Sequence, residues 1–304
     1  MKSCRRALGA LMAAVMLMNV AGCASDNPFS SRVGEDGSIV VGSQDYYSNE
    51  IIAEIIAQSL EREGVDVARD MRIGQREAYL PDVESGAIDV MPEYTGNLVR
   101  YWDEAAPLGT AEEVYEELRA AAPPGIGIGP QAEAADEDVY VMPEEKAAQQ
   151  GIESLEDLAA PGKTRGRAWR LGGPYELSTR DYGPEGLRRV YGVDAEFSPL
   201  EDAGGPLTVK ALRDGTVDMA RMSSSSPAIE ENHLRILSDP RHLLPPSHVV
   251  PLLSDRVDPQ ARAIIARVMS RLGRDDLVAL NKASVAEQKS AATIAHEWLD
   301  GAIP

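Results

Sequence analysis

Few side chains in this sequence form a set that could carry out a reaction. Four consecutive serines at residues 223–226 offer hydroxyl nucleophiles, but no Gly-x-Ser-x-Gly turn surrounds them and no histidine can be tied to them. None of the four histidines is spaced from another as zinc ligands are. The glycines at 125–129 stand between prolines and lack the Gly-Lys-Ser start of a phosphate-binding helix. We therefore expect no catalytic residues, no metal and no cofactor.

One residue carries a clear chemical signal, the cysteine at position 23. It follows the small residues Ala21 and Gly22, which close a segment with a basic start and an apolar run. That layout is typical of a secretory signal peptide, and a cysteine directly after the small residues is typical of a bacterial lipobox. We expect residues 1–22 to be a lipoprotein signal peptide and Cys23 to carry lipid on the extracytoplasmic face of the cell membrane. An ordinary signal peptide with a chance cysteine is the alternative.

The charge and the cysteine count limit the partners. The net charge is −19, and removing residues 1–22 with their three basic side chains leaves −22. Such a charge disfavours nucleic acid and anionic lipid headgroups as partners. The second cysteine, Cys4, leaves with the signal segment, so we expect no disulfide and no thiolate metal site in the mature fold.

Strands alternate with helices along the rest of the chain. Residues 23–37 are polar and rich in glycine, proline and serine, which predicts a tether. A strand at 38–42 precedes a helix of regularly spaced isoleucines, which residues 48–50 are expected to cap and Gly64 to end. Further strands are expected at 65–71, 87–92, 139–142, 170–173 and 217–220, and further helices at 77–85, 110–122, 154–158, 184–191, 207–213, 259–272, 275–282 and 286–299. This alternation predicts two α/β lobes built on parallel sheets.

One short pattern occurs in both halves of the chain. Residues 84–90 and 213–219 share the order charged-x-Gly-x-β-branched-Asp-apolar. Each is predicted to be a glycine-capped helix end that runs into a strand. Because ligands of open α/β sheets bind at the carboxyl ends of the strands, we expect both strand ends to face the space between the lobes.

Six longer stretches carry a resemblance to a known family. They are IVVGSQDYYSNEIIAEIIAQSLEREG, IGQREAYLPDVESGAIDVMPEYTGNLVRYW, DEDVYVMPEEKA, LGGPYELSTRDYG, PLEDAGGPLTVKALRDGTVD and HLLPPSHVVPLL. In this order they resemble the solute-binding proteins of bacterial ABC importers for quaternary amines, of the OpuAC/ProX-like type, over about residues 38–300. The resemblance implies a two-lobed type II periplasmic-binding-protein fold with two crossover strands. Residues 38–138 plus 245–304 would form the first lobe, and 139–244 the second.

The resemblance also implies a binding site. In the family, tyrosines cage the trimethylammonium head, and cationic and hydroxyl groups hold the carboxylate end where one is present. Within the Pro-Glu-Tyr-Thr-Gly motif, Tyr94 matches a cage tyrosine, and Tyr140 matches a second. Arg180 matches the arginine that meets the carboxylate, and Asn97 holds a position that is often threonine. Further expected ligand residues are Tyr46, in the loop after the first strand, and Asp138, in the stretch that holds Tyr140.

Three positions depart from the family pattern, and they are also expected to touch the ligand. Gln44 stands where several betaine binders have lysine, and Ser223 stands where an aromatic residue is expected. The second-lobe cage tyrosine is replaced by Thr208 or Val209. Since each desolvated cation–π face contributes about 1–2 kcal/mol, two missing faces would weaken binding by roughly tenfold to a thousandfold. Other tyrosines could replace them, namely Tyr46, Tyr47, Tyr175 and Tyr182; equally, the serines could line a pocket for a larger or hydroxyl-rich solute.

The sequence therefore predicts a receptor without catalytic activity. It would capture a small solute, a quaternary amine such as glycine betaine or choline, and deliver it to the permease subunits of an ABC transporter. Two alternatives remain open, a protein of the same fold that binds a more polar or aromatic solute, and a sensor domain that signals rather than delivers. An enzyme on this scaffold is disfavoured because the sequence shows no set of residues that could act together as catalytic acid and base. The lipid anchor would hold the protein at the membrane.

Overall fold

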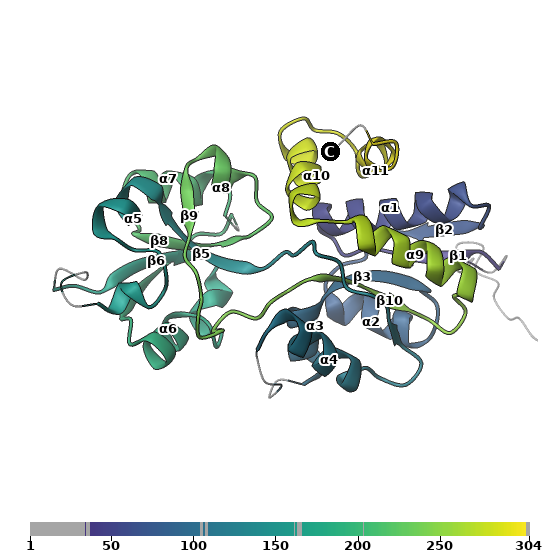
Figure 1. Cartoon of the computed structure of the whole chain (residues 1–304), viewed down its shortest axis with the longest axis horizontal. Coiled ribbons are helices and arrows are strands. Elements are labelled where there is room, and N and C mark those ends of the chain that lie inside the picture. The colour runs from purple at the N-terminus through teal and green to yellow at the C-terminus, as the bar shows by residue number, and fades with distance from the viewer. Residues whose placement is uncertain are drawn as a thin grey trace, which may run out of the picture.

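Two lobes, each built on a five-stranded sheet, lie side by side in the computed structural model (Figure 1). The structure describes residues 37–103, 109–160, 166–202 and 204–301, with Gly34, Ala106 and Gly162. The expected signal segment and Cys23 lie outside these residues. No helix within the described residues has the length and apolar character needed to span a membrane. The predicted two-lobed α/β fold is confirmed, but both sheets are mixed and not parallel as predicted.

The first lobe combines the N-terminal half of the described chain with its C-terminal part. Its strands are β1 (Ile39–Gly42), β2 (Val67–Asp70), β3 (Val90–Tyr94), β4 (Gly127–Ile128) and β10 (Val249–Leu253), in the order β2-β1-β3-β10-β4. Strand β1 is parallel to β2 and β3, whereas β10 is antiparallel to β3 and β4. One face carries α1 (Tyr47–Arg62), α9 (Pro259–Arg271), α10 (Arg274–Val285) and α11 (Ala291–Leu299). The other carries α2 (Arg76–Glu84), α3 (Thr95–Trp102) and α4 (Ala111–Ala121).

The second lobe repeats this plan with the middle of the chain. Its strands are β5 (Asp138–Pro143), β6 (Trp169–Gly173), β7 (Ala195–Pro199), β8 (Met219–Ser223) and β9 (Leu234–Ile236), in the order β7-β6-β8-β5-β9. Its helices are α5 (Glu144–Gln150), α6 (Pro184–Tyr191), α7 (Pro206–Arg213) and α8 (Ala228–Glu231), with short 3-10 helices η1 (Asp157–Ala159) and η2 (Tyr175–Thr179). Each sheet face again packs on its own apolar core.

Helix α1 shows why the predicted elements are mostly found and where one prediction is wrong. Its isoleucines and Leu60 are fully buried, as their helical spacing predicts. The helix, however, begins at Tyr47 after a cap residue, Tyr46, whose side chain makes no capping bond, so residues 48–50 lie inside the helix. The polar side chain of Asn49 can be buried there because both of its polar atoms are hydrogen-bonded: it accepts the Gln44 backbone N–H and donates to the Pro92 carbonyl, both at 2.9 Å. It fastens the turn after β1 to β3.

The repeated pattern forms the same corner in each lobe. Gly86 and Gly215 end their helices with positive φ values of 72° and 71°, the conformation that glycine adopts without cost. The aspartates three residues later, Asp89 and Asp218, each accept a backbone N–H of the neighbouring strand, at 2.9 and 3.0 Å. The strands therefore begin only after these aspartates, later than predicted. The two carboxylates hydrogen-bond to neighbouring strands and so stabilise the sheets.

Two segments cross between the lobes, one leading into β5 and one leading from β9 to β10 (Figure 1). They run antiparallel where Ala135 pairs with His248. The Asp136 N–H donates to the Ser247 carbonyl at 2.9 Å, which fixes the two crossovers to each other. The two connections make a hinge, and the ends of β3 and β8 lie beside it.

Candidate ligand-binding cleft

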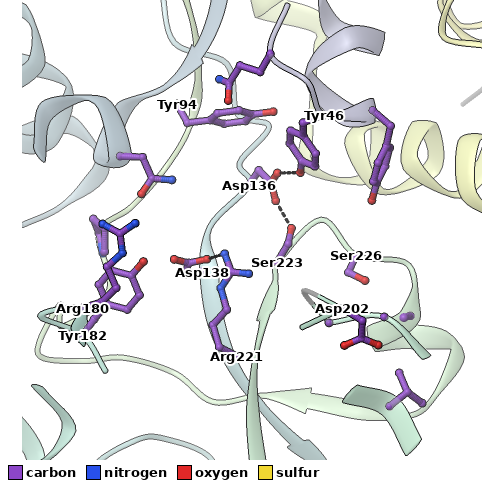
Figure 2. A pocket seen from close by; sticks show the side chains of 18 of the residues that line it. Tyr46, Tyr94, Asp136, Asp138, Arg180, Tyr182, Asp202, Arg221, Ser223 and Ser226 are labelled. Atoms are coloured by element: carbon purple, nitrogen blue, oxygen red, sulfur yellow. Dashed lines mark hydrogen bonds and ion pairs between the residues drawn. The ribbon is translucent and has the colours of Figure 1, made fainter. Parts of the chain in front are cut away.

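A large cleft lies between the lobes and is lined by both of them and by the hinge (Figure 2). Its volume is about 1620 Å³, well above the roughly 300–1,000 Å³ of ordinary small-ligand sites. The lobes therefore stand apart in this structure. Seven of the residues expected from the sequence to touch a ligand line the cleft: Gln44, Tyr46, Tyr94, Asn97, Asp138, Arg180 and Ser223.

The Pro-Glu-Tyr-Thr-Gly motif builds the first-lobe wall of the cleft through its buried glutamate. The Glu93 carboxylate accepts two bonds of 2.7 Å from the Arg76 guanidinium and a further bond from the Tyr79 hydroxyl. It also accepts the backbone N–H of Tyr94 at 2.8 Å. Although burial alone would lower the pKa of Arg76, Glu93 raises it, so the guanidinium stays charged. Glu93 thereby fixes the backbone from which the Tyr94 ring projects.

The last residues of the motif attach this wall to the hinge. The Thr95 N–H donates to the His248 carbonyl at 2.9 Å, and the Thr95 hydroxyl accepts the His248 N–H at 3.1 Å. A Cβ on Gly96 would stand 2.3 Å from the Pro246 carbonyl oxygen. Only glycine permits the crossover to approach so closely. Asn97, one residue further, lines the cleft.

Tyr94 lines the cleft, but its hydroxyl is buried. The residue is 4% exposed, and its hydroxyl lies close to Ser48 and Asn49 of α1 without a well-aligned hydrogen bond to either. Burial, helped by Asp136, raises the pKa of Tyr94 well above its usual value, so the phenol is neutral. The Gln44 side-chain nitrogen is likewise buried without a partner in the described part of the chain. Since buried polar groups are rarely left unpaired, the Gln44 nitrogen is a donor that a polar group of a bound solute would satisfy.

Asp136 joins the two sides of the cleft. Its carboxylate accepts the Tyr46 hydroxyl from the first lobe and the Ser223 hydroxyl from the second, as Figure 2 shows. The Ser225 hydroxyl donates to it at 2.8 Å, and Ser225 is held in turn by Asn281 of α10 at 2.9 Å. Burial, followed by Asp136, raises the pKa of Tyr46 well above its usual value. Asp136 was not among the ligand residues expected from the sequence. Its only sequence signal is that a carboxylate stands two residues before Asp138 and four before Tyr140.

An ion pair lies next to Asp136. Asp138 pairs with Arg221, from the neighbouring strand β8 (Figure 2). Burial lowers the pKa of Arg221, and Asp136 counteracts this shift. Asp138 therefore lines the cleft as expected, but its charge is compensated by a residue that sequence reasoning had not singled out.

The second-lobe wall is more open. Arg180 is exposed and has no ion-pair partner among the residues described, and Tyr182 stands beside it in Figure 2. Ser226 and Asp202 line the opposite side, where Asp202 accepts the backbone N–H of Thr208 at 3.1 Å. This wall offers polar groups on loops.

Two expected ligand residues lie outside the cleft. Tyr140 is fully buried in the second-lobe core, and its hydroxyl donates to the Tyr182 carbonyl. Thr208 is also buried, and its hydroxyl donates to Asp202 at 2.6 Å. In this structure Tyr140 positions the loop of Tyr182, while the cleft position next to Thr208 is held by Val209. Their contacts with a ligand stay predictions.

The arrangement offers binding groups rather than reactive ones. Among the described residues, no three histidine, cysteine, aspartate or glutamate side chains are placed to hold a metal ion. The deep part of the cleft presents aromatic rings, hydroxyls and a carboxylate, which together suit a cation with a polar tail.

Comparison with known proteins agrees with this geometry. Residues 37–301 match the family model described as OpuAC, substrate binding domain of ABC-type glycine betaine transport system. The chain is 23% identical over 286 residues to the glycine-betaine-binding protein of Pseudomonas aeruginosa, covering 89% of this chain and 90% of that protein. It is 25% identical over 274 residues to the glycine betaine-binding protein YehZ of Escherichia coli, covering 86% and 89%. A crystal structure described as a glycine betaine/carnitine/choline ABC transporter shares the fold, with a TM-score of 0.77, 18% identity and coverage of 87% and 98%.

Proposed function

The chain belongs to the OpuAC family, the substrate-binding domains of ABC-type glycine betaine transport systems, and we propose that it captures a quaternary amine between its lobes for delivery to an ABC permease. The observation that carries the proposal is the deep first-lobe wall. There the buried Tyr94 ring, the Tyr46 ring and the Asp136 carboxylate meet at the hinge (Figure 2).

The chemistry of this wall matches that of a methylated ammonium. Such a head has no N–H to donate, so it is held by ring faces and by charge rather than by hydrogen bonds. Tyr94 supplies a ring that its surroundings already hold in place, and Asp136 supplies the opposite charge. The polar tail of the solute would lie towards Gln44 on the same wall, and Arg180 of the second lobe would approach it when the lobes close.

Delivery would depend on the position of the lobes. The cleft is wider than a single small solute needs, so a bound solute contacts both walls only after the hinge closes. A ligand that touches both lobes favours the closed arrangement by its extra contacts there. The permease would recognise that arrangement. The role is binding without catalysis.

Calorimetry with choline, glycine betaine and carnitine tests the capture function. We expect at least one of them to bind with a dissociation constant in the micromolar range or below, while glycine, which lacks the methyl groups, does not bind. Small-angle scattering with the same solutes should show a smaller radius of gyration. If none of the three binds and none compacts the protein, the proposal is wrong.

The place of the protein in the cell is part of the same proposal. Cys23, at the end of the signal-like segment, would carry the lipid that anchors the folded lobes outside the cytoplasmic membrane. Growth with an alkyne-tagged fatty acid should label the wild-type protein, and Cys23→Ser should abolish the label. Labelling that persists in Cys23→Ser would contradict the anchor.

A further inference from the structure

We propose that Asp136 makes this site select solutes with a net positive charge and an uncharged polar tail over zwitterions, so that choline binds more tightly than glycine betaine. This inference rests on the proposed capture function and names the charge class of its solute. It makes Asp136 a specificity-determining residue.

The first step is that neutral donors stabilise the charge of Asp136, which Arg221 offsets only in part because its ion pair is with Asp138. Its carboxylate accepts three hydroxyls, those of Tyr46, Ser223 and Ser225. All three donors are neutral groups, and no cation among the described residues forms an ion pair with Asp136. A carboxylate can accept about four hydrogen bonds, so these donors hold the anion in place and leave its charge available.

The second step is the local balance of charge. The neighbouring cation, Arg221, is already paired with Asp138. These three groups therefore sum to one negative charge at the base of the cleft. The Tyr46 and Tyr94 rings stand on the same side (Figure 2), so a head group placed against the rings also lies near Asp136. Charge interactions are stronger in such a half-buried site than in water.

The third step concerns the other end of the solute. In glycine betaine a single methylene joins the ammonium to the carboxylate, so the carboxylate cannot leave the neighbourhood of Asp136. Among the first-lobe residues that line the cleft, Gln44 is a neutral amide, and the charge of Arg76 is matched by Glu93. The buried Gln44 amide nitrogen is a neutral donor, which suits a hydroxyl oxygen. Arg180 stands on an exposed loop of the other lobe.

Binding of two solutes to the wild-type protein and to Asp136→Asn tests this inference. Asparagine keeps the shape and one acceptor oxygen but removes the charge. We expect the wild-type protein to bind choline at least tenfold more tightly than glycine betaine. In Asp136→Asn we expect choline affinity to fall at least tenfold, equal to about 1.4 kcal/mol, while betaine affinity changes less, so that the ratio collapses.

Glu153→Gln is the matched control. It removes the same charge from an exposed side chain outside the cleft, so it should leave both affinities within twofold. Thermal unfolding of both variants reports whether they fold. A measurement that needs no variant compares choline with its uncharged carbon analogue, 3,3-dimethylbutan-1-ol, on the wild-type protein; we expect choline to bind at least tenfold more tightly.

Three results would overturn the inference, and they separate it from the capture function. If glycine betaine binds the wild-type protein as tightly as choline does, the site accepts a zwitterion and only the inference fails. An unchanged affinity ratio in Asp136→Asn has the same meaning. If neither choline nor any other quaternary amine binds, the capture function fails and the inference fails with it.

Discussion

The two walls of the cleft differ in how firmly they are built. On the first lobe, Tyr94 stands at the end of a central strand, and its backbone is fixed by the buried Glu93 and by the hinge. On the second lobe, Arg180 and Ser226 stand on loops and are exposed or half-buried. A side chain that is already ordered loses little entropy when a ligand binds. The difference indicates that the first lobe recognises the head group, and that the second lobe adds contacts after closure.

The largest effect should come from removing the charge that supports the first-lobe wall. Glu93→Gln leaves the half-buried Arg76 guanidinium without the fully buried carboxylate that is its counter-charge. Breaking a buried ion pair in this way costs about 3–5 kcal/mol, so we expect a loss of that size in the free energy of unfolding, measured with urea. The control Glu84→Gln changes an exposed glutamate of α2, the helix that carries Arg76, and should cost less than about 0.5 kcal/mol. A loss below about 1 kcal/mol in Glu93→Gln would show that the wall does not depend on it.

The comparison of the walls predicts unequal losses from two tyrosines. Tyr94→Ala should weaken binding of the preferred quaternary amine about a hundredfold, near 2.7 kcal/mol, because a fixed ring face is lost. Tyr182→Ala should weaken it less than tenfold. Tyr175, which is 65% exposed and outside the cleft, provides the control Tyr175→Ala. Calorimetric titration of the three variants decides; equal losses at Tyr94 and Tyr182 would remove the asymmetry that we infer.

Behind its open wall, the second lobe is stabilised by buried polar contacts, of which those of Asp218 are an example. Burial alone would raise the pKa of Asp218, but hydrogen bonds from Arg167 and Arg170 hold it well below its usual range. A carboxyl whose pKa is lowered on folding stabilises the protein above its unfolded-state pKa, near 4, and this contribution is lost as the pH falls through the folded-state pKa. Asp218→Asn should therefore cost about 2 kcal/mol at pH 7.

The same variant gives a pH signature. The difference in unfolding free energy between the wild-type protein and Asp218→Asn should shrink as the pH is lowered from 6 towards 3, as measured by urea unfolding at each pH. Choline affinity at pH 7 should not change, because Asp218 lies away from the cleft lining. A difference that stays constant or grows on acidification would contradict the ion pairs as its cause.

The smallest effect should come from Arg180. Because its guanidinium is exposed on a loop, Arg180→Ala should weaken binding of a solute with a carboxylate, such as carnitine, by up to tenfold, and choline by less than twofold. The control Arg188→Ala changes another exposed arginine of the same lobe, outside the cleft. Equal losses of affinity for carnitine and for choline would mean that Arg180 does not bind the carboxylate.

The first-lobe wall could be predicted from the sequence because its signals are local. Tyr94 lies in a five-residue motif, and the Gly96 close approach and the Glu93 support lie within the same motif. The lobes followed from strand and helix periodicity, and the glycine-capped corners from their short repeat. The starts of the two strands after these corners were misplaced because the aspartates bond to the neighbouring strand, and β7, β9 and β10 were not predicted.

The rest of the site depends on contacts between distant parts of the chain. Asp136 meets Tyr46 and Ser223, which are 90 and 87 residues away in sequence. The Arg221 partner of Asp138 is set by strand register, which the sequence does not display. Tyr140 matched a cage position, yet it is fully buried in the core of the second lobe. A motif match alone could not reveal this placement.

A crystal structure with bound choline would test the central claim most directly, since that claim is a position. We predict that the trimethylammonium head lies against the Tyr94 and Tyr46 rings within about 5 Å of the Asp136 carboxylate, with the hydroxyl towards Gln44. A head group held instead between Arg180 and Tyr182 on the second lobe, away from Asp136, would contradict the account.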